Sequence, residues 1–355
     1  MVTRLDRYIA ATVARAVAVV WVVLLALFTF TAFVGELGDV GTGRYGLKEA
    51  ALYVVLSMPR LTYQLFPPMA LLGTLLGLGA MAGNNELVVM RASGISLARI
   101  IAAVAKIGAV LMVFIAVLGE WLAPVSEQYA QNLRNAALLD QATLTTGNSL
   151  WIRDAERFIH VRRVGRDGSF ADIVIYSVTP DHRLEQFLTA ASARYDGRQW
   201  RLFDVTINHL SERQVRVERH DEQVWVSPLV PQLVNAAAVE PQFLPVAGLV
   251  RYIGFLRRNQ LSADEYIQAL WKKMISPLAT LVMVLLAVPF VFGSLRTVPI
   301  SQRVFVGTLV GIGFYVINQM VAYMGLVFEL SPVATAVAPT ALFFALAVLL
   351  IRRIR

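Results

Sequence analysis

A polar segment between two long apolar segments carries the side chains best suited to binding. It reads Asn84-Asn85-Glu86-Leu87-Val88-Val89-Met90-Arg91-Ala92-Ser93-Gly94-Ile95-Ser96. Its inner part, residues 86–92, is long enough for about two helical turns. Leu87 and Met90 would then share one face at i, i+3 spacing, with Val88 as a further candidate for that face. Such an amphipathic helix on a membrane surface is suited to docking a partner protein, and a plain loop between two spans is the alternative.

Motifs of common catalytic and cofactor sites are absent from the sequence. There is no G-x-x-x-x-G-K-[ST] phosphate loop, no H-E-x-x-H and no G-x-S-x-G. The chain has no cysteine, which excludes disulfides, iron–sulfur clusters and thiol nucleophiles. Residues 41–46 match G-x-G-x-x-G, but an apolar span precedes them instead of the strand that this motif needs. We therefore expect neither a catalytic site nor a cofactor bound by this chain.

The composition indicates a polytopic membrane protein. Of 355 residues, 57% are hydrophobic and only 16% are charged, whereas soluble domains carry about 25% charged residues. The net charge of +8 is of the kind that nucleic-acid-binding proteins carry. Much of this excess lies at the ends of apolar segments, where basic residues set membrane orientation. We therefore expect a membrane-lipid environment and no nucleic-acid partner.

Six apolar segments have the length of a membrane span. They are residues 16–34, 61–83, 100–121, 274–295, 304–328 and 331–351. The first covers about 28 Å as a helix, the thickness of a hydrocarbon core. It is longer than the apolar part of a signal peptide and lacks a small-x-small cleavage site, so we expect it to remain as an uncleaved span.

The region between the third and fourth spans has a different character. Charged residues become frequent and balanced, and short runs alternate between apolar and polar side chains, as in half-buried strands. Asp196-Gly197 separates two of these runs as a hairpin turn would. We expect an antiparallel β-domain over residues 147–228, a proline-rich linker after it, and helices over residues 246–258 and 262–273.

The predicted fold class is therefore membrane α-helical, with six transmembrane helices and an all-β domain inserted between helices 3 and 4. The expected domains are 1–135 with helices 1–3, 136–245 with the β-domain and linker, and 246–355 with helices 4–6. Eleven basic residues fall in the proposed inner segments and three in the short outer ones. The inner ones are Arg4, Arg7, Arg15, Arg91, Arg99, Lys106, Arg296, Arg303, Arg352, Arg353 and Arg355, and the outer ones are Arg44, Lys48 and Arg60. This asymmetry predicts cytoplasmic termini and an outside β-domain.

Three stretches resemble the lipopolysaccharide-export permeases of the LptF/LptG family, and the LptG branch in particular. They are Leu71 to Gly94 with Glu86-Leu87-Val88-Val89-Met90-Arg91-Ala92-Ser93-Gly94, Gly119-Glu120-Trp121-Leu122-Ala123-Pro124, and Phe292-Gly293-Ser294-Leu295-Arg296-Thr297-Val298-Pro299. The span layout with its inserted β-domain extends the resemblance over essentially the whole chain.

The resemblance implies a function in a multi-subunit exporter. An LptG-like permease pairs with the LptF paralogue in the inner membrane of Gram-negative bacteria, on a dimer of the LptB ATPase, with LptC as a further partner. ATP and Mg²⁺ would then bind the separate ATPase. The complex would extract lipopolysaccharide, and the β-domain, a jellyroll in the family, would belong to the periplasmic bridge that carries the lipid onward.

The resemblance also implies site residues. The segment around Glu86 corresponds to the coupling helix that docks on the ATPase, with Glu86 as the acidic contact and Leu87, Met90 and Arg91 as the adjoining surface. Arg60 and Arg134 match positions that contact lipid phosphates. An arginine fork near the headgroup level binds phosphate bidentately, although anchoring to ordinary lipid is the alternative.

The start of the first outer segment departs from the family. The family often places lysines at the outer end of span one, where this chain has the acidic run Phe33-Val34-Gly35-Glu36-Leu37-Gly38-Asp39. Either Arg44 replaces the lysines or the phosphate contacts shift to the partner subunit. Phe33 and Phe314 are candidates for lining an acyl-chain cavity, with bundle core or lipid-facing surface as the alternative.

A second function class is compatible with the same features. Glycine-rich spans and an amphipathic inner helix would also suit a membrane scaffold or sensor that transports nothing and binds a partner through its β-domain. Lipid crosslinking inside the helical bundle distinguishes the two classes.

Overall fold

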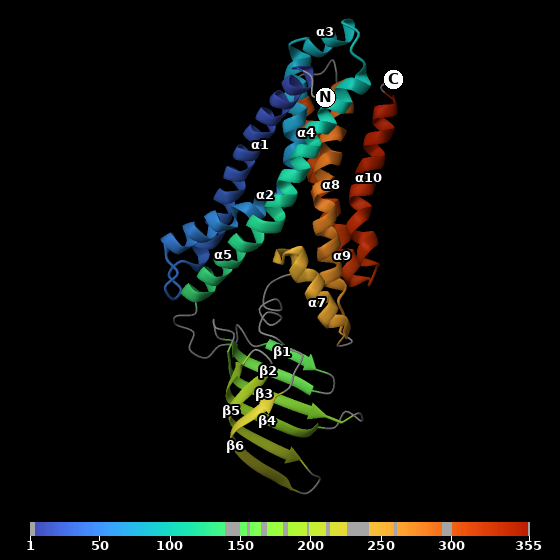
Figure 1. Ribbon diagram of the computed structural model, residues 1–355. Coiled ribbons are helices and arrows are strands. Elements are labelled where there is room, and N and C mark those ends of the chain that lie inside the picture. Colours follow the sequence, from blue (N-terminus) through green and yellow to red (C-terminus); the bar gives the residue numbers. More distant parts are fainter. Residues whose placement is uncertain are drawn as a thin grey trace. The chain divides into compact units, whose positions relative to one another are not determined.

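The computed structural model describes most of the chain. The described residues are 4–138, 150–154, 157–164, 169–179, 184–196, 199–210, 214–225, 241–258, 261–292 and 300–353. The chain forms two compact units. The helical unit comprises Met1–Gln141, Pro245–Leu249 and Asp264–Arg355, and the β unit comprises Ala142–Leu244 and Val250–Ala263 (Figure 1).

Long helices dominate the helical unit. They are α1 (Arg4–Glu36), α2 (Leu47–Gly83), α4 (Leu97–Val117), α5 (Ala123–Leu138), α8 (Asp264–Phe292), α9 (Ile300–Val327) and α10 (Pro332–Arg353), with the short α3 (Glu86–Ala92), the 3₁₀ turn η1 (Leu37–Asp39) and the π turn η2 (Leu118–Leu122) between them. Six helical segments of the described chain are long and apolar enough to cross a membrane: Arg4–Asp39, Leu47–Gly83, Leu97–Leu138, Asp264–Phe292, Phe305–Val327 and Pro332–Arg353. This confirms the predicted six-span class.

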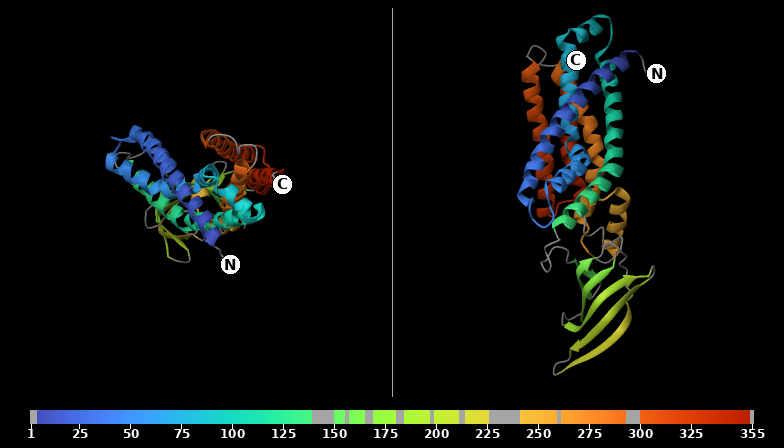
Figure 2. Two further views of the ribbon diagram at one scale, coloured as in Figure 1. Left: turned by 90° about the horizontal axis from the view of Figure 1, so that it is seen from above. Right: turned by 90° about the vertical axis from the view of Figure 1, so that its left-hand side faces the viewer.

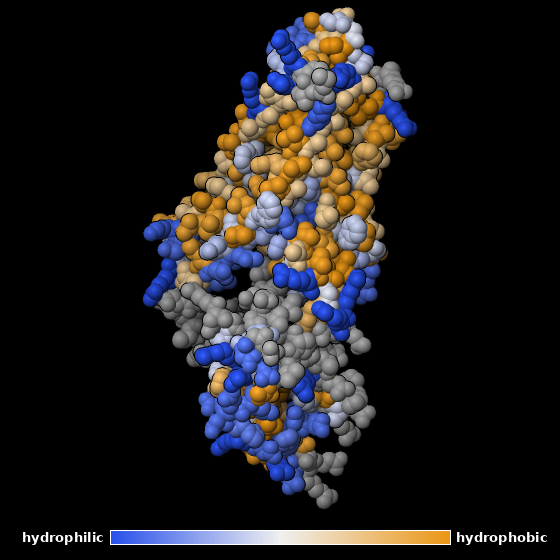
Figure 3. Space-filling view, viewed as in Figure 1, coloured by the Kyte–Doolittle hydropathy of each residue, from blue (hydrophilic) through white to orange (hydrophobic). Residues whose placement is uncertain are grey.

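Helices α2 and α8 form the centre of the bundle. In its most apolar stretch, α2 has 78% of its residues buried, against 11% for α1 and 17% for α9. Much of the apolar surface of α1 and α9 therefore faces away from this chain, as expected of helices that contact lipid or another subunit. Hydrophobic side chains cover most of the visible face of the helical unit, and hydrophilic ones gather towards its two ends (Figure 3).

Glycines in α2 let α1 approach closely. A Cβ at Gly73 would overlap the backbone of Val17, and one at Gly77 would come within 3.1 Å of the Val13 Cα atom. Ile9, Val13 and Val17 form the buried stripe of α1 at i, i+4 spacing. Gly73 and Gly77 thus provide the close helix contact that small residues allow in membrane-spanning helices.

The helices extend beyond the predicted spans. Residues 47–60, expected in an outside loop, belong to α2, so Arg60 lies within a helix. The third span continues through η2 into α5 as far as Leu138. The helix expected over residues 262–273 joins the fourth span in α8. Hydropathy marks only the part of a helix that lies in apolar surroundings, whereas backbone hydrogen bonds and packing decide where the helix ends.

The β unit holds one antiparallel sheet. Its strands are β1 (Leu150–Asp154), β2 (Arg157–Val164), β3 (Phe170–Val178), β4 (Leu184–Tyr195), β5 (Trp200–Leu210) and β6 (Val215–Trp225), in the order β1-β2-β3-β4-β5-β6. The sheet is strongly curved (Figure 2). The predicted inserted all-β domain is confirmed. A 3₁₀ turn, η3 (Pro241–Phe243), and helix α7 (Val246–Arg258) follow.

Candidate functional site

Helix α3 lies at the end of the helical unit that also carries the first and last described residues (Figures 1 and 2). Asn85, in the left-handed conformation at φ 60°, turns the chain from α2 into α3. Gly94, at φ +86°, follows the helix, and the Ser96 hydroxyl accepts a hydrogen bond from the Arg99 amide at 3.3 Å to cap α4. The predicted helix over residues 86–92 is confirmed. Gly94 is suited to ending it and Ser96 to capping the next helix.

The two apolar faces of α3 have different surroundings. Leu87 is only 3% exposed and belongs to the bundle core, against which Met90 also packs. Val88 and Val89 are 39% and 62% exposed, and Arg91 is exposed beside them. Leu87 and Met90, expected from the resemblance in the docking surface, therefore hold α3 to its own bundle. The outward face carries Val88, Val89 and Arg91.

Glu86 begins α3 and contacts the first helix of the chain. The Tyr8 hydroxyl donates a hydrogen bond of 2.8 Å to one Glu86 carboxylate oxygen. The Asn84 side-chain amide donates to the other oxygen at 3.3 Å. Glu86 is half-buried, so these two donors fix its orientation while leaving it accessible from outside.

A buried ion cluster lies near the same end of the bundle. Asp6 of α1 is 3% exposed at its side chain and forms ion pairs with Lys106 at 2.6 Å and Arg99 at 3.4 Å, both on α4. Burying a carboxylate costs several kcal/mol unless it is paired, so this cluster fixes α1 against α4. No spacing pattern in the sequence points to this cluster; its one signal is that Asp6 is the single acidic residue before Glu36.

At the opposite end of the helical unit, which we call the α5 end, Arg134 is held by carboxylates. Its Nε and Nη2 atoms lie 3.0 Å from Glu36 and 2.6 Å from Asp39. The guanidinium also lies 5.5 Å from the centre of the Tyr53 ring. The acidic run that departs from the family pattern thus supplies the partners of Arg134.

Tyr45 completes this cluster. Its hydroxyl donates a hydrogen bond of 2.8 Å to the Glu36 carboxylate that also contacts Arg134. Burial, followed by the interaction with Glu36, raises the pKa of the Tyr45 hydroxyl well above its usual value of 10.0. The hydroxyl therefore remains protonated and donates to Glu36 at every physiological pH.

Arg60 is also paired with a carboxylate. Its Nε atom lies 3.2 Å from Glu127 of α5, whose side chain is 1% exposed. Gln131 donates a hydrogen bond of 2.9 Å to the other Glu127 oxygen. The expected phosphate-binding arginines, Arg60 and Arg134, thus lie together at the α5 end, but the three carboxylates beside them leave no excess of positive charge.

The remaining expected site residues lie in different places. The Arg44 backbone amide donates to the Ala137 carbonyl oxygen at 2.8 Å, which places Arg44 at the α5 end. Phe33 packs against Tyr53, Val54 and Ala130, in a small apolar cluster. Phe314 is 5% exposed and packs edge-on against Phe343 in the bundle core. Within this chain, Phe314 is therefore a packing residue.

Glu120, from the second motif of the resemblance, joins three segments of the helical unit. Its carboxylate accepts the Val246 backbone amide at 2.9 Å and contacts Lys273 at 3.4 Å. The π turn η2 places it there, and a Cβ at the neighbouring Gly119 would overlap the Tyr63 ring. Glycine is thus required beside Glu120 by close packing.

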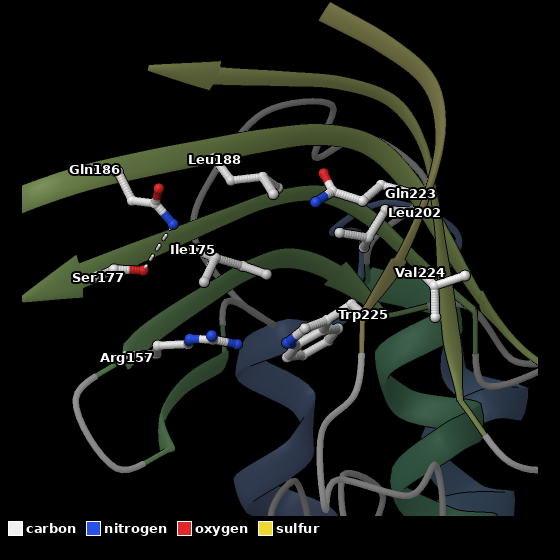
Figure 4. A pocket seen from close by; sticks show the side chains of 9 residues that line it. All are labelled: Arg157, Ile175, Ser177, Gln186, Leu188, Leu202, Gln223, Val224 and Trp225. Atoms are coloured by element: carbon white, nitrogen blue, oxygen red, sulfur yellow. Dashed lines mark hydrogen bonds between the residues drawn. The ribbon is translucent and has the colours of Figure 1, made fainter. Parts of the chain in front are cut away.

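The β unit contains a cavity of about 330 Å³ on one face of the sheet. Its apolar walls come from Ile175, Leu188 and Leu202, and its polar ones include Arg157 (Figure 4). Its lining also includes Ser177, Gln186, Gln223, Val224 and Trp225. Among the described residues, the buried side-chain atoms Gln223 Oε1 and Trp225 Nε1 have no hydrogen-bond partner. An amphipathic ligand would pair with these atoms and fill the apolar part.

Comparisons with known proteins agree over nearly the whole chain. The model of the family "Lipopolysaccharide export system permease LptF/LptG" matches residues 7–353. The lipopolysaccharide export system permease protein LptG of Escherichia coli K12 is 35% identical over 352 residues, 98% of each chain. Its counterpart in Haemophilus influenzae is 34% identical over 345 residues, 97% of this chain and 96% of the relative. The chain therefore belongs to the LptF/LptG family of lipopolysaccharide export system permeases.

Proposed function

We propose that this chain is the LptG-type permease subunit of an ATP-driven exporter that extracts lipopolysaccharide from the bacterial inner membrane. ATP hydrolysis would take place on a separate LptB-type ATPase dimer, with LptF and LptC as further partners. The α3 end would face the cytoplasm and the β unit the periplasm. The distribution of basic residues supports this orientation.

The observation that carries the proposal is the presentation of α3. Leu87 anchors the helix in the bundle, while Val88, Val89 and Arg91 face outwards next to the oriented carboxylate of Glu86. A small apolar patch with charged groups at its rim is suited to a groove on another protein. In this interpretation, ATP-driven closure of the ATPase dimer moves α3 and narrows a lipid cavity between the two permease subunits.

The substrate would meet the chain at the α5 end. Arg60 and Arg134 are close to the expected headgroup level, and guanidinium groups bind phosphate bidentately. Because Glu36, Asp39 and Glu127 already pair with these arginines, a lipid phosphate must displace a carboxylate to bind. We propose that Arg44 and the partner permease supply the additional positive charge.

The β unit would take part in the onward route of the lipid. The cavity beside Leu188 and Leu202 offers apolar surface for an acyl chain, and Trp225 Nε1 offers a hydrogen-bond donor that no described residue accepts. A photoactivatable residue at Leu188 should capture lipopolysaccharide during ATP turnover if the lipid passes through this unit. Capture only at positions in the helical unit would remove the β unit from the route.

Co-purification tests the proposal directly. The tagged chain, expressed with its native membrane neighbours, should retain a soluble ATPase and a six-span paralogue. Glu86→Ala should lose the ATPase and keep the paralogue, because only the docking carboxylate is removed. Glu185→Ala makes the same substitution at an exposed position on β4 and should change nothing.

Two results would contradict the proposal. One is a wild-type chain that emerges alone or only with partners of the β unit, which would favour the scaffold or sensor. The other is a Glu86→Ala variant with normal ATPase retention and full transport, which would remove Glu86 from docking.

A further inference from the structure

The first two turns of α1 contact both α3 and α4 through polar side chains. Tyr8 donates to Glu86 of α3 at 2.8 Å. Asp6 pairs with Lys106 and Arg99 of α4 at 2.6 and 3.4 Å. We call these five residues the α1 clamp. Packing of membrane-spanning helices does not need such a polar cluster, because these helices associate in lipid mainly through small residues and van der Waals contact.

We propose that Tyr8 is a positioning residue for Glu86 and that the α1 clamp transmits the displacement of α3 to α1. The inference rests on the proposed function, in which a separate ATPase moves α3. It adds the route by which that movement reaches a membrane-spanning helix.

The Tyr8–Glu86 contact has the geometry of a positioning interaction. Glu86 begins a helix of only seven residues, which follows a single left-handed residue, Asn85. Such a short helix has little stability of its own, so contacts outside it fix the direction of its first side chain. The Tyr8 hydroxyl binds one carboxylate oxygen, which leaves lone pairs on Glu86 for a cation on the ATPase.

The Asp6 cluster makes the connection stiff. Its carboxylate is buried, whereas Lys106 and Arg99 keep nearly half of their side-chain surface exposed. Separating α1 from α4 would leave a buried charge without its partners, which is strongly unfavourable. The end of α1 therefore has to follow α3 and α4 rather than slide past them.

The rest of α1 is arranged to carry the movement onwards. Below the clamp, Val13 and Val17 lie against Gly77 and Gly73 of α2. Beyond this contact, Val19, Val22, Val23, Leu27 and Phe30 are largely exposed. Phe33 and Glu36 hold the far end of α1 to α2 and α5. A displacement at the clamp would therefore tilt α1 between its two held ends and move this exposed face towards lipid or a partner subunit.

The test measures lipopolysaccharide released per ATP hydrolysed by the reconstituted complex. Tyr8→Phe removes one hydroxyl at a side chain that is 49% exposed, so the fold should survive. Glu86 keeps its carboxylate and its hydrogen bond from Asn84 in this variant, so we expect the ATPase to be retained with an unchanged KM for ATP. The ratio of lipid released to ATP hydrolysed should fall about three- to tenfold, as for loss of one ordinary hydrogen bond. Tyr129→Phe is the matched control, since Tyr129 is 68% exposed on α5.

A second pair of variants tests the ion cluster. Lys106→Met should lower the same ratio, and Lys106→Arg should restore it, because the guanidinium keeps the charge beside Asp6. A wild-type ratio in Tyr8→Phe would overturn the inference. So would loss of the ATPase from Tyr8→Phe, which would place Tyr8 in docking. A wild-type complex that releases no lipid would contradict the proposed function itself. The Glu86→Ala co-purification tests that function separately from the role of Tyr8.

Discussion

At the scale of single residues, charge pairing within the chain decides what the candidate site can bind. Arg134 has the fork geometry that suits a phosphate, but Glu36 and Asp39 already occupy two of its nitrogen atoms. An arginine with two carboxylates is locally anionic, so an incoming phosphate gains less from it than from an unpaired arginine. By this argument, the acidic run after span one would weaken phosphate binding at Arg134.

Neutralising these carboxylates should strengthen lipid binding. In Glu36→Gln with Asp39→Asn, Arg134 loses its charged partners and can contact phosphate without displacing them. We expect the assembled complex to bind lipopolysaccharide about tenfold more tightly, the effect of one charged hydrogen bond. Competition binding against a dephosphorylated lipid measures the phosphate contribution.

The same effect should depend on the guanidinium. Adding Arg134→Ala to the double variant should abolish the gain, and Glu185→Gln, an exposed glutamate on β4, should have no effect. Unchanged affinity in the double variant would show that lipid phosphates do not reach Arg134.

At the scale of elements, the contact between α1 and α2 depends on the absence of side chains. Gly73 and Gly77 let the α1 backbone approach at Val17 and Val13. Because lipid offers no hydrophobic driving force between helices, such close packing provides much of their association. This contact also fixes the part of α1 about which the proposed displacement of the helix would turn.

Gly73→Ala should destabilise the protein. The added Cβ would overlap the Val17 backbone, which cannot move without displacing α1. We expect a loss of about 1–3 kcal/mol, typical of overpacking, seen as a lower Tm in detergent.

Gly313→Ala is the matched control in a membrane helix. A Cβ at Gly313 meets nothing within 4 Å, and alanine favours a helix over glycine by about 1 kcal/mol. This variant should be neutral or more stable. Equal destabilisation by both substitutions would show that the α1–α2 contact has no special role.

The exposed face of α3 makes a separate prediction. Val89→Glu places a charge at a side chain that is 62% exposed and should leave the fold intact. In the complex it should weaken ATPase docking, because the apolar patch would then bury an unpaired carboxylate. Leu87→Glu should instead reduce the yield of folded protein, since Leu87 lies in the core. Pull-down of the ATPase, together with size-exclusion profiles, separates the two effects.

At the scale of the whole molecule, the two candidate binding regions belong to different units. Helix α3 is part of the helical unit, and the cavity is part of the β unit. Helix α3 and both chain ends share one end of the helical unit, while the β-domain is inserted between the third and fourth spans. Six spans, an even number, would bring both termini to the same side of a membrane. Three spans precede the β-domain, which would place that domain on the other side. In the proposed function, this topology would place the ATPase contact and the onward route of the lipid on opposite sides of the membrane.

Cysteine labelling in intact spheroplasts checks this topology. The chain has no native cysteine, so an introduced one is its only labelled site. Val89→Cys should react with a membrane-impermeant maleimide only after lysis, whereas Glu185→Cys should react in intact spheroplasts. The reverse pattern would invert the proposed orientation.

The sequence by itself determined the class of this protein. Long apolar segments of bilayer length and period-two alternation are local properties, so six spans, an inserted β-domain and the helix at Glu86 were predictable. The glycine stop at Gly94 and the Ser96 cap are equally local. The resemblance identified the family from contiguous motifs for the same reason.

Only the tertiary structure decided which side of each element faces inwards and which charges meet. A seven-residue helix with apolar residues on two faces has no preferred side until it packs, and packing buried Leu87 while exposing Val88 and Val89. The pairs Asp6–Lys106, Arg60–Glu127 and Arg134–Glu36 join residues far apart in the sequence. Such contacts depend on how helices align over their whole length, which local spacing does not encode.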